Sequence, residues 1–229
     1  MVALDFDSFS PAWNLAQQLR GTVDMFKVGS QLFTAEGPVA VQKLAGAGFE
    51  IFLDLKFHDI PNTVTGSIAA AVRLPGVRLI TLHTTGGVEM MRAARRAAGN
   101  GDARPLLLGV TILTSLDSAA LVPLGINGPA EKRVIELAKL AQASGLDGVV
   151  ASAHDVAAIR AACGPQLKIV VPGIRPAAAD VGDQARVATA AEAVRAGADY
   201  LVVGRPITAA GDPVTAANKI REEMDGARN

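Results

Sequence analysis

Short apolar runs alternate with alanine-rich helical stretches along this chain, and this alternation restricts the possible fold more than any other feature. It is typical of a parallel sheet, because parallel strands need a crossover connection that is usually a helix. Eight such units within 229 residues favour a closed (β/α)8 barrel, or TIM barrel. We predict strands at residues 2–5, 25–29, 51–56, 79–83, 106–111, 148–152, 168–171 and 200–203, and helices at 11–19, 36–47, 62–74, 88–98, 129–144, 155–163, 189–196 and 213–224.

The alternative fold is an open doubly wound sheet, but no G-x-G-x-x-G motif follows the first predicted strand. No linker, charge block or low-complexity segment interrupts the chain, so we expect residues 1–229 to form a single domain. Two connections, 115–128 and 172–187, are longer than usual. Both follow the C-terminal ends of strands, where barrels of this type carry their chemistry, and both are candidate lids.

The charge balance excludes several classes of partner. With 22 basic and 22 acidic residues the formal net charge is zero, so we expect no nucleic-acid or acidic-membrane partner, and any anion site must be local. No apolar run reaches the ~18 residues of a membrane span, and strand-like sequence at the N-terminus leaves no room for a targeting segment. The one cysteine, Cys163, fits a reducing compartment. We therefore expect a cytoplasmic protein.

Two charges interrupt the third predicted strand. Asp54 and Lys56 are two positions apart, so their side chains point to the same side of the strand, about 6.6 Å apart along it. At a separation of about 7 Å and an effective dielectric constant of 20 their attraction is about 2.4 kcal/mol, and desolvating each ion costs several kcal/mol. A buried structural salt bridge is the simpler alternative, but this balance favours a functional role.

Other polar residues lie at or just after the C-terminal ends of predicted strands, so the barrel would gather them at one mouth. Two have structural alternatives: Asp59 could complement a helix dipole, and Lys27 could extend its ammonium group to the rim. The role of His83 stays open. The full set is Asp5, Lys27, Asp54, Lys56, Asp59, His83, Thr111, Thr114, Arg175, Gln184, Gly204 and Arg205.

The segment after the eighth strand predicts a phosphate site. Gly204 lets backbone amides approach an anion, and Arg205 offers a forked cation. Barrels commonly bind phosphate with the loops after strands 7 and 8. An ordinary turn with a solvated arginine is the alternative.

The segment 54–63, DLKFHDIPNT, resembles the signature of the bacterial orotidine 5′-phosphate decarboxylase family. Its D-x-K-x-x-D core is shared with sister barrels of other activities, whereas the extension HDIPNT is more specific. The resemblance covers the whole chain, including ALD at 3–5, KVG at 27–29, TILTS at 111–115, PGIRP at 172–176, GDQ at 182–184 and GRP at 204–206.

The resemblance implies a homodimeric barrel that decarboxylates orotidine 5′-monophosphate to UMP, the last step of de novo pyrimidine biosynthesis, without a cofactor or metal. It implies that Lys56 is the proton donor within an array of Lys27, Asp54, Lys56 and Asp59. Asp5 and Lys27, with Asp59 and Thr63, would bind the ribose, and Thr114 would contact the pyrimidine. Gln184, Gly204 and Arg205 would bind the phosphate, with Arg175 on a closing loop. Asp59, Ile60 and Thr63 would be contributed to the neighbouring subunit's site.

Two other functions stay open at this point. One is a metal-dependent sister enzyme that acts on a sugar phosphate, such as a 3-keto-gulonate-6-phosphate decarboxylase or a hexulose-phosphate synthase. It would need an oxygen-rich Mg²⁺ site, which Lys56 beside Asp54 disfavours. The other is a barrel that only binds a nucleotide phosphate, for which alternating charges in the mouth would be unnecessary.

Overall fold

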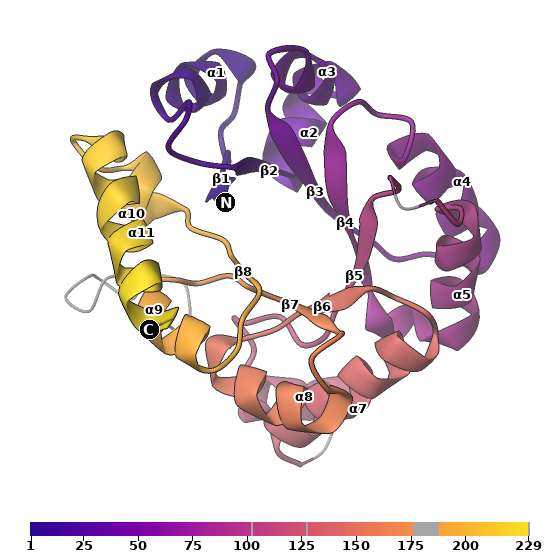
Figure 1. Ribbon diagram of the computed structural model, residues 1–229. Helices are drawn as coiled ribbons and strands as arrows, with labels where there is room; N and C mark the ends of the chain where they lie inside the picture. The colour runs from indigo at the N-terminus through magenta and orange to yellow at the C-terminus, as the bar shows by residue number, and fades with distance from the viewer. Residues whose placement is uncertain (102, 127, 176–187, 229) are drawn as a thin grey trace.

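The eight predicted strands form one parallel sheet that closes into a barrel. The computed structural model describes residues 1–101, 103–126, 128–175 and 188–228. Strand order follows the chain, and a parallel bridge between Val2 and Val203 closes the ring, with the Ala3 amide donating to the Val203 carbonyl at 2.9 Å. Figure 1 shows the ring with its helices outside. The strands are β1 (Val2–Ala3), β2 (Met25–Gly29), β3 (Glu50–Phe57), β4 (Val77–His83), β5 (Leu106–Val110), β6 (Gly148–Val150), β7 (Lys168–Val171) and β8 (Tyr200–Leu201).

Helices connect successive strands and bury their apolar faces against the outside of the barrel (Figure 1). The prediction of a (β/α)8 barrel is therefore confirmed. The α-helices are α1 (Phe9–Gln18), α2 (Ser30–Glu36), α3 (Pro38–Gly46), α4 (Pro61–Ala71), α5 (Gly87–Ala97), α6 (Ser118–Leu121), α7 (Ala130–Ala143), α8 (Val156–Cys163), α9 (Ala190–Arg195), α10 (Arg205–Thr208) and α11 (Pro213–Arg228), and the 3-10 helices are η1 (Thr84–Gly86), η2 (Val122–Leu124) and η3 (Ala153–Asp155).

The predicted helix at 36–47 corresponds to α3, which begins two residues later than predicted, and the prediction missed the preceding helix α2. Gly37 has a φ of 65° and ends α2, with its amide donating to the Phe33 carbonyl at 2.8 Å. Pro38 then opens α3, where the missing amide proton does no harm. Gly37 thus ends one helix and Pro38 begins the next.

The apolar core has two layers. The larger lies between strands and helices, and a smaller cluster fills the barrel itself, built from Ala3, Met25, Phe52, Leu79, Leu108, Val170 and Val202. Strand alternation turns Leu53 outward and Phe52 inward. Asp54, two positions after Phe52, therefore continues the inward face above this apolar cluster. The charged residues thus lie directly above the packed apolar interior of the barrel.

Strand β3 has extra residues where it pairs with β4. Leu53 pairs with Ile80 and Phe57 with Leu82, so four steps along β3 match two along β4. Within this irregularity Lys56 has a φ of 51°, the only positive φ of a non-glycine residue in the described part of the chain. Such a conformation is uncommon for a residue with a side chain. The bulge places Lys56 out of regular strand geometry.

The two long connections are described to different extents. The segment 115–128 contains α6 and η2. In the other, the Arg175 amide donates to the Ala188 carbonyl at 3.0 Å, while residues 176–187, including Gln184, lie outside the described residues. Over the residues that the structure describes, none of the helices combines the length and apolar character needed to cross a membrane.

Candidate active site

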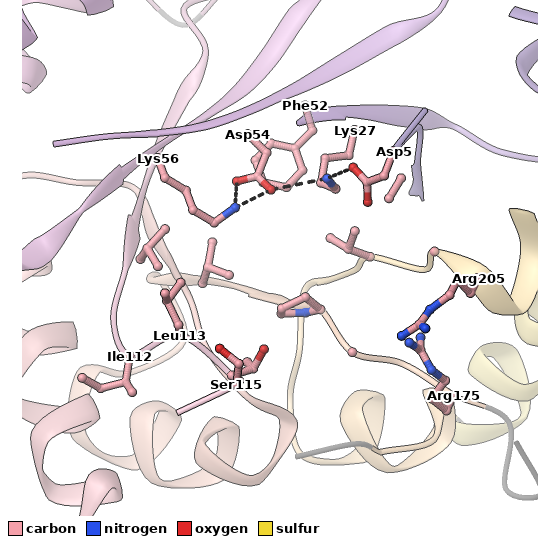
Figure 2. A pocket seen from close by; sticks show the side chains of 18 residues that line it. Asp5, Lys27, Phe52, Asp54, Lys56, Ile112, Leu113, Ser115, Arg175 and Arg205 are labelled. Atoms are coloured by element: carbon pink, nitrogen blue, oxygen red, sulfur yellow. Dashed lines mark hydrogen bonds and ion pairs between the residues drawn. The ribbon is translucent and has the colours of Figure 1, made fainter. Parts of the chain in front are cut away.

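A cavity of about 370 Å³ opens at the C-terminal ends of the strands. Phe52 and Val202 from the inner apolar cluster form part of its lining. Figure 2 shows a row of charged side chains along one wall, and two arginines on the facing side. The polar residues predicted at the mouth that line this cavity are Asp5, Lys27, Asp54, Lys56, Thr114, Arg175, Gly204 and Arg205.

The charged row is a chain of alternating ion pairs from three neighbouring strands. The ammonium nitrogen of Lys27 lies 2.9 Å from Asp5 Oδ1 and 3.6 Å from Asp54 Oδ2. The ammonium nitrogen of Lys56 lies 2.8 Å from both carboxylate oxygens of Asp54. Lys27 and Asp54 are buried, whereas Asp5 and Lys56 are partly open to the cavity. Asp54 thus holds two ammonium groups at once.

The environment of Asp54 favours its ionised form. Burial alone would raise the pKa of this carboxyl, but the charges of Lys56 and Lys27 and hydrogen bonds from Lys56 and Thr81 outweigh burial and lower it. Both oxygens of Asp54 are already engaged by ammonium groups. This arrangement suits a fixed cation and not a site that binds a divalent metal. The described residues contain no cluster of three His, Cys, Asp or Glu side chains able to hold a metal ion.

The absence of a side chain at Gly29 leaves space for the ion pair between Lys27 and Asp5. A Cβ atom at this position would lie 2.7 Å from the Lys27 ammonium nitrogen and 3.1 Å from Asp5 Oδ1. Gly29 is the last residue of β2, and its φ of −93° is ordinary for any residue. The close approach of the Lys27–Asp5 pair, and not backbone strain, therefore requires glycine here.

Two arginines face the charged row. Figure 2 shows the Arg175 and Arg205 side chains pointing toward one another at the end of the cavity near Gly204. Arg175 is buried, and its guanidinium group donates to the Ile174 carbonyl at 3.0 Å. Arg205 opens the short helix α10 directly after Gly204. Two guanidinium groups on one side of a cavity suit a doubly charged anion such as phosphate.

Thr114 lines the cavity, next to Leu113 and Ser115 in the chain. The site prediction is incomplete in this region, since it omitted the lining residues Phe52, Ile112 and Pro172. Apolar residues carry no chemical signal in a sequence, and only the closed barrel brings them to the cavity.

Asp59, Ile60 and Thr63 are exposed and do not line the cavity of their own chain. Asp59 Oδ1 accepts a hydrogen bond from the Ile60 amide at 2.6 Å. Ile60 has 65% of its surface exposed, unusually much for a large apolar residue. Of the predicted array, one chain thus brings together Lys27, Asp54 and Lys56, and Asp59 lies outside its cavity.

His83 and His58 lie side by side at the rim, with ring centroids 5.3 Å apart. Burial lowers the pKa of His83, and the nearby His58 and Lys56 lower it further, while Asp54 opposes them. These effects together favour the neutral form of His83. It does not line the cavity.

Thr81 is a polar contact that the sequence analysis missed. It is fully buried, accepts a hydrogen bond from the Lys56 amide at 2.9 Å and donates one to Asp54 Oδ1 at 2.9 Å. A possible signal was present, because Thr81 precedes His83 by two positions and so shares its strand face.

Comparisons with known proteins agree over nearly the full length. Residues 1–220 match the model of the orotidine 5′-phosphate decarboxylase / HUMPS family. An orotidine 5′-phosphate decarboxylase of Anaeromyxobacter dehalogenans is 55% identical, covering 95% of this chain and 94% of the relative, and one of Trichlorobacter lovleyi is 53% identical, covering 97% and 93%. The crystal structure of orotidine 5′-phosphate decarboxylase from Lactobacillus acidophilus is similar with a TM-score of 0.82 at 37% identity, covering 98% of this chain and 97% of that one.

Proposed function

Because the chain belongs to the orotidine 5′-phosphate decarboxylase / HUMPS family, we infer that it decarboxylates orotidine 5′-monophosphate to UMP and CO₂, the last step of de novo pyrimidine biosynthesis. It is a carboxy-lyase, the activity for which relatives more than half identical over nearly its whole length are named. One observation in the cavity supports the chemistry most directly: the Lys56 ammonium group is held by both oxygens of Asp54 at the open end of the barrel.

The reaction needs a cation at a fixed position. The bond between C6 of the pyrimidine and the carboxylate carbon breaks, CO₂ leaves, and the electron pair stays on C6. We propose that the Lys56 ammonium group stabilises this developing carbanion, because preorganised charge is most effective where charge develops in the transition state. Lys56 then donates a proton from its ammonium group to C6, which yields UMP, and the neutral amine regains a proton from water. No step requires a cofactor.

We propose that Asp54 is the group that fixes Lys56. Its two oxygens leave the ammonium nitrogen little freedom, and the same carboxylate lies 3.6 Å from the Lys27 ammonium nitrogen. Lys27 in turn binds Asp5, and we assign this outer pair to the ribose hydroxyl groups. Thr114, which lines the same cavity, is assigned to the pyrimidine.

The phosphate is assigned to Arg175, Gly204 and Arg205, with Gln184 as a further ligand. The phosphate would thus be bound at one end of the cavity, and the decarboxylation would take place at the charged row. Binding energy gained at a non-reacting group can orient the base against Lys56. The connection after β7 would then close over the bound substrate.

We propose a homodimer with composite active sites. Asp59, Ile60 and Thr63 are exposed next to β3 yet absent from the cavity of their own chain, which suits a role in the neighbouring subunit's site. Asp59 would complete the array of Lys27, Asp54 and Lys56 there. We further propose a cytoplasmic location, consistent with a single, buried cysteine, Cys163, and one catalytic domain spanning residues 1–229.

The absorbance of orotidine 5′-monophosphate incubated with EDTA-treated protein tests the function. We expect decarboxylation at the full rate, since the chemistry uses ammonium groups. Activity that is lost with EDTA and restored by Mg²⁺ would instead favour a metal-dependent sugar-phosphate enzyme, and no activity under any condition would favour a binding protein.

Lys56→Ala tests the assignment of the proton donor. We expect turnover to be abolished while UMP still binds, as measured by calorimetry, because the phosphate ligands are untouched. A Lys56→Ala protein that retains turnover would contradict the role given to Lys56.

A further inference from the structure

The mismatch between β3 and β4 leaves one β4 residue opposite three β3 residues. Because Leu53 pairs with Ile80 and Phe57 with Leu82, Thr81 alone faces the bulged segment 54–56. A regular parallel strand would offer a backbone carbonyl to the Lys56 amide. In the bulge that amide donates to the Thr81 hydroxyl instead, at 2.9 Å.

The Thr81 hydroxyl makes a second bond, to the carboxylate that holds the lysine side chain. It donates its proton to Asp54 Oδ1 at 2.9 Å, and the same oxygen lies 2.8 Å from the Lys56 ammonium nitrogen. A hydroxyl has one proton to donate, so accepting from Lys56 and donating to Asp54 together set its orientation. A closed ring results, from the Lys56 amide through Thr81 and Asp54 to the Lys56 ammonium group.

We propose that Thr81 is a positioning residue for the decarboxylation: its hydroxyl joins the backbone of Lys56 to the carboxylate of Asp54 and so fixes the proton donor at both ends of its side chain. This inference rests on the proposed function and goes beyond it, since Thr81 does not line the cavity and would not touch the substrate. The effect is indirect, through the placement of Lys56.

Two properties of the site make such a residue necessary. Lys56 has a φ of 51°, a conformation that a residue with a side chain adopts only when its surroundings impose it. A lysine side chain also has four rotatable bonds, and an ammonium group displaced by 1 Å loses much of its effect on the reaction. Threonine suits the position because branching at Cβ restricts χ1.

The charged and titratable groups around Asp54 come from the strands packed against it. Lys27 reaches it from β2, with Asp5 on the far side of Lys27, Lys56 lies on β3 itself, and His83 approaches from β4. Thr81 is the uncharged donor of this group, and its hydrogen bond lowers the pKa of Asp54. Removing the hydroxyl therefore raises the pKa of Asp54 toward its ordinary value, with the charges left in place.

The experiment compares Thr81→Val with Thr81→Ser and with Thr84→Val. Valine keeps the shape and loses the hydroxyl, and serine restores it. Thr84 is a matched control: it is equally buried, and its hydroxyl donates to the Val110 carbonyl at 2.8 Å instead of to a charged group. For each protein, kcat, KM and the pH profile of kcat/KM are measured with orotidine 5′-monophosphate, at temperatures where thermal unfolding shows the protein to be folded.

We expect Thr81→Val to lower kcat about 10- to 100-fold, the size associated with a lost hydrogen bond to a charged group, with a much smaller change in KM. The acid limb of its pH profile moves to higher pH, Thr81→Ser recovers most of kcat, and Thr84→Val keeps the wild-type kcat. A Thr81→Val protein with the kcat of Thr84→Val, or a serine variant as slow as the valine variant, overturns the inference. An inactive wild type would instead refute the proposed function.

Discussion

The ammonium nitrogen of Lys56 lies 2.8 Å from both carboxylate oxygens of Asp54, although the two residues are only two positions apart on one strand. In a regular strand the two side chains would stand about 6.6 Å apart along the strand. The positive φ of Lys56 breaks that geometry and lets its side chain bind Asp54. The contact is thus a property of the bulge, and the first prediction follows from it.

Asp54→Asn is expected to lower kcat at least about 100-fold, because the amide keeps the shape but gives up the charge that holds two ammonium groups. Steady-state decarboxylation at pH 7 measures this. Asp147→Asn is the matched control, since Asp147 binds Arg104 at 2.6 Å immediately before β6, at the opposite end of the barrel. We expect the control to lose stability and keep kcat; equal losses of kcat in both variants would show a general effect of a broken ion pair.

Gly29→Ala is expected to raise KM and lower kcat, together about 10-fold in kcat/KM, because the new methyl group displaces the Lys27 ammonium group from Asp5. Folding is expected to change little, as the backbone at Gly29 is ordinary. Gly46→Ala, in α3 with open space around it, is the control and should stabilise the protein by about 0.5–1 kcal/mol with unchanged kinetics. Wild-type kinetics for Gly29→Ala would mean that Lys27 can shift without consequence.

His83 is expected to make the folded state sensitive to mild acid. The folded-state pKa of His83 lies below its ordinary value of 6.5, so its contribution to stability is fully present above pH 6.5 and is lost as the pH falls through the lowered folded pKa. Urea unfolding at pH 7.5 and pH 5 should show a smaller loss of stability for His83→Gln than for the wild type. The difference should be below about 1 kcal/mol, because the half-buried imidazole is partly screened by solvent.

The control for this measurement is His154→Gln, since His154 lies in η3 after β6 and outside the His58–His83 pair. Its stability should follow the wild type at both pH values. An identical pH dependence for wild type and His83→Gln would remove His83 as the cause.

Subunit mixing tests whether Asp59 crosses between chains. Lys56→Ala and Asp59→Ala proteins are each expected to be nearly inactive. In a fully exchanged equal mixture half of the dimers contain one chain of each kind, and one of their two sites has both wild-type residues, so about a quarter of the wild-type activity should return. No recovery in a mixture whose exchange is shown by mass spectrometry would place Asp59 in its own chain's site.

The sequence predicts the barrel well because its signals are local. All eight strands lie where apolar runs predicted them, and the charged residues at their C-terminal ends meet because parallel strands bring those ends together. Gly37 and Pro38 also carried a local signal, the break between α2 and α3, that the prediction of one helix did not use.

Contacts that depend on register could not be predicted in the same way. Thr81 is 25 residues from Lys56 in the chain, and only the pairing of β3 with β4 decides that its hydroxyl faces the bulge. The ion pair of Asp54 and Lys56 likewise depends on one backbone angle that no residue type at position 56 announces. The assignment of Asp59, Ile60 and Thr63 to a neighbouring site stays a prediction.

The extra length of β3 has a consequence for how this protein can change over time. Between Leu53 and Phe57 the strand has two residues more than β4 needs, and the lysine at the centre of the proposed chemistry is one of them. Deleting Leu55 and Lys56 would leave one residue opposite Thr81 and so restore an even ladder, and it would erase the reactive amine. A two-residue change in the length of β3 at this place would thus decide whether the barrel carries the proposed proton donor.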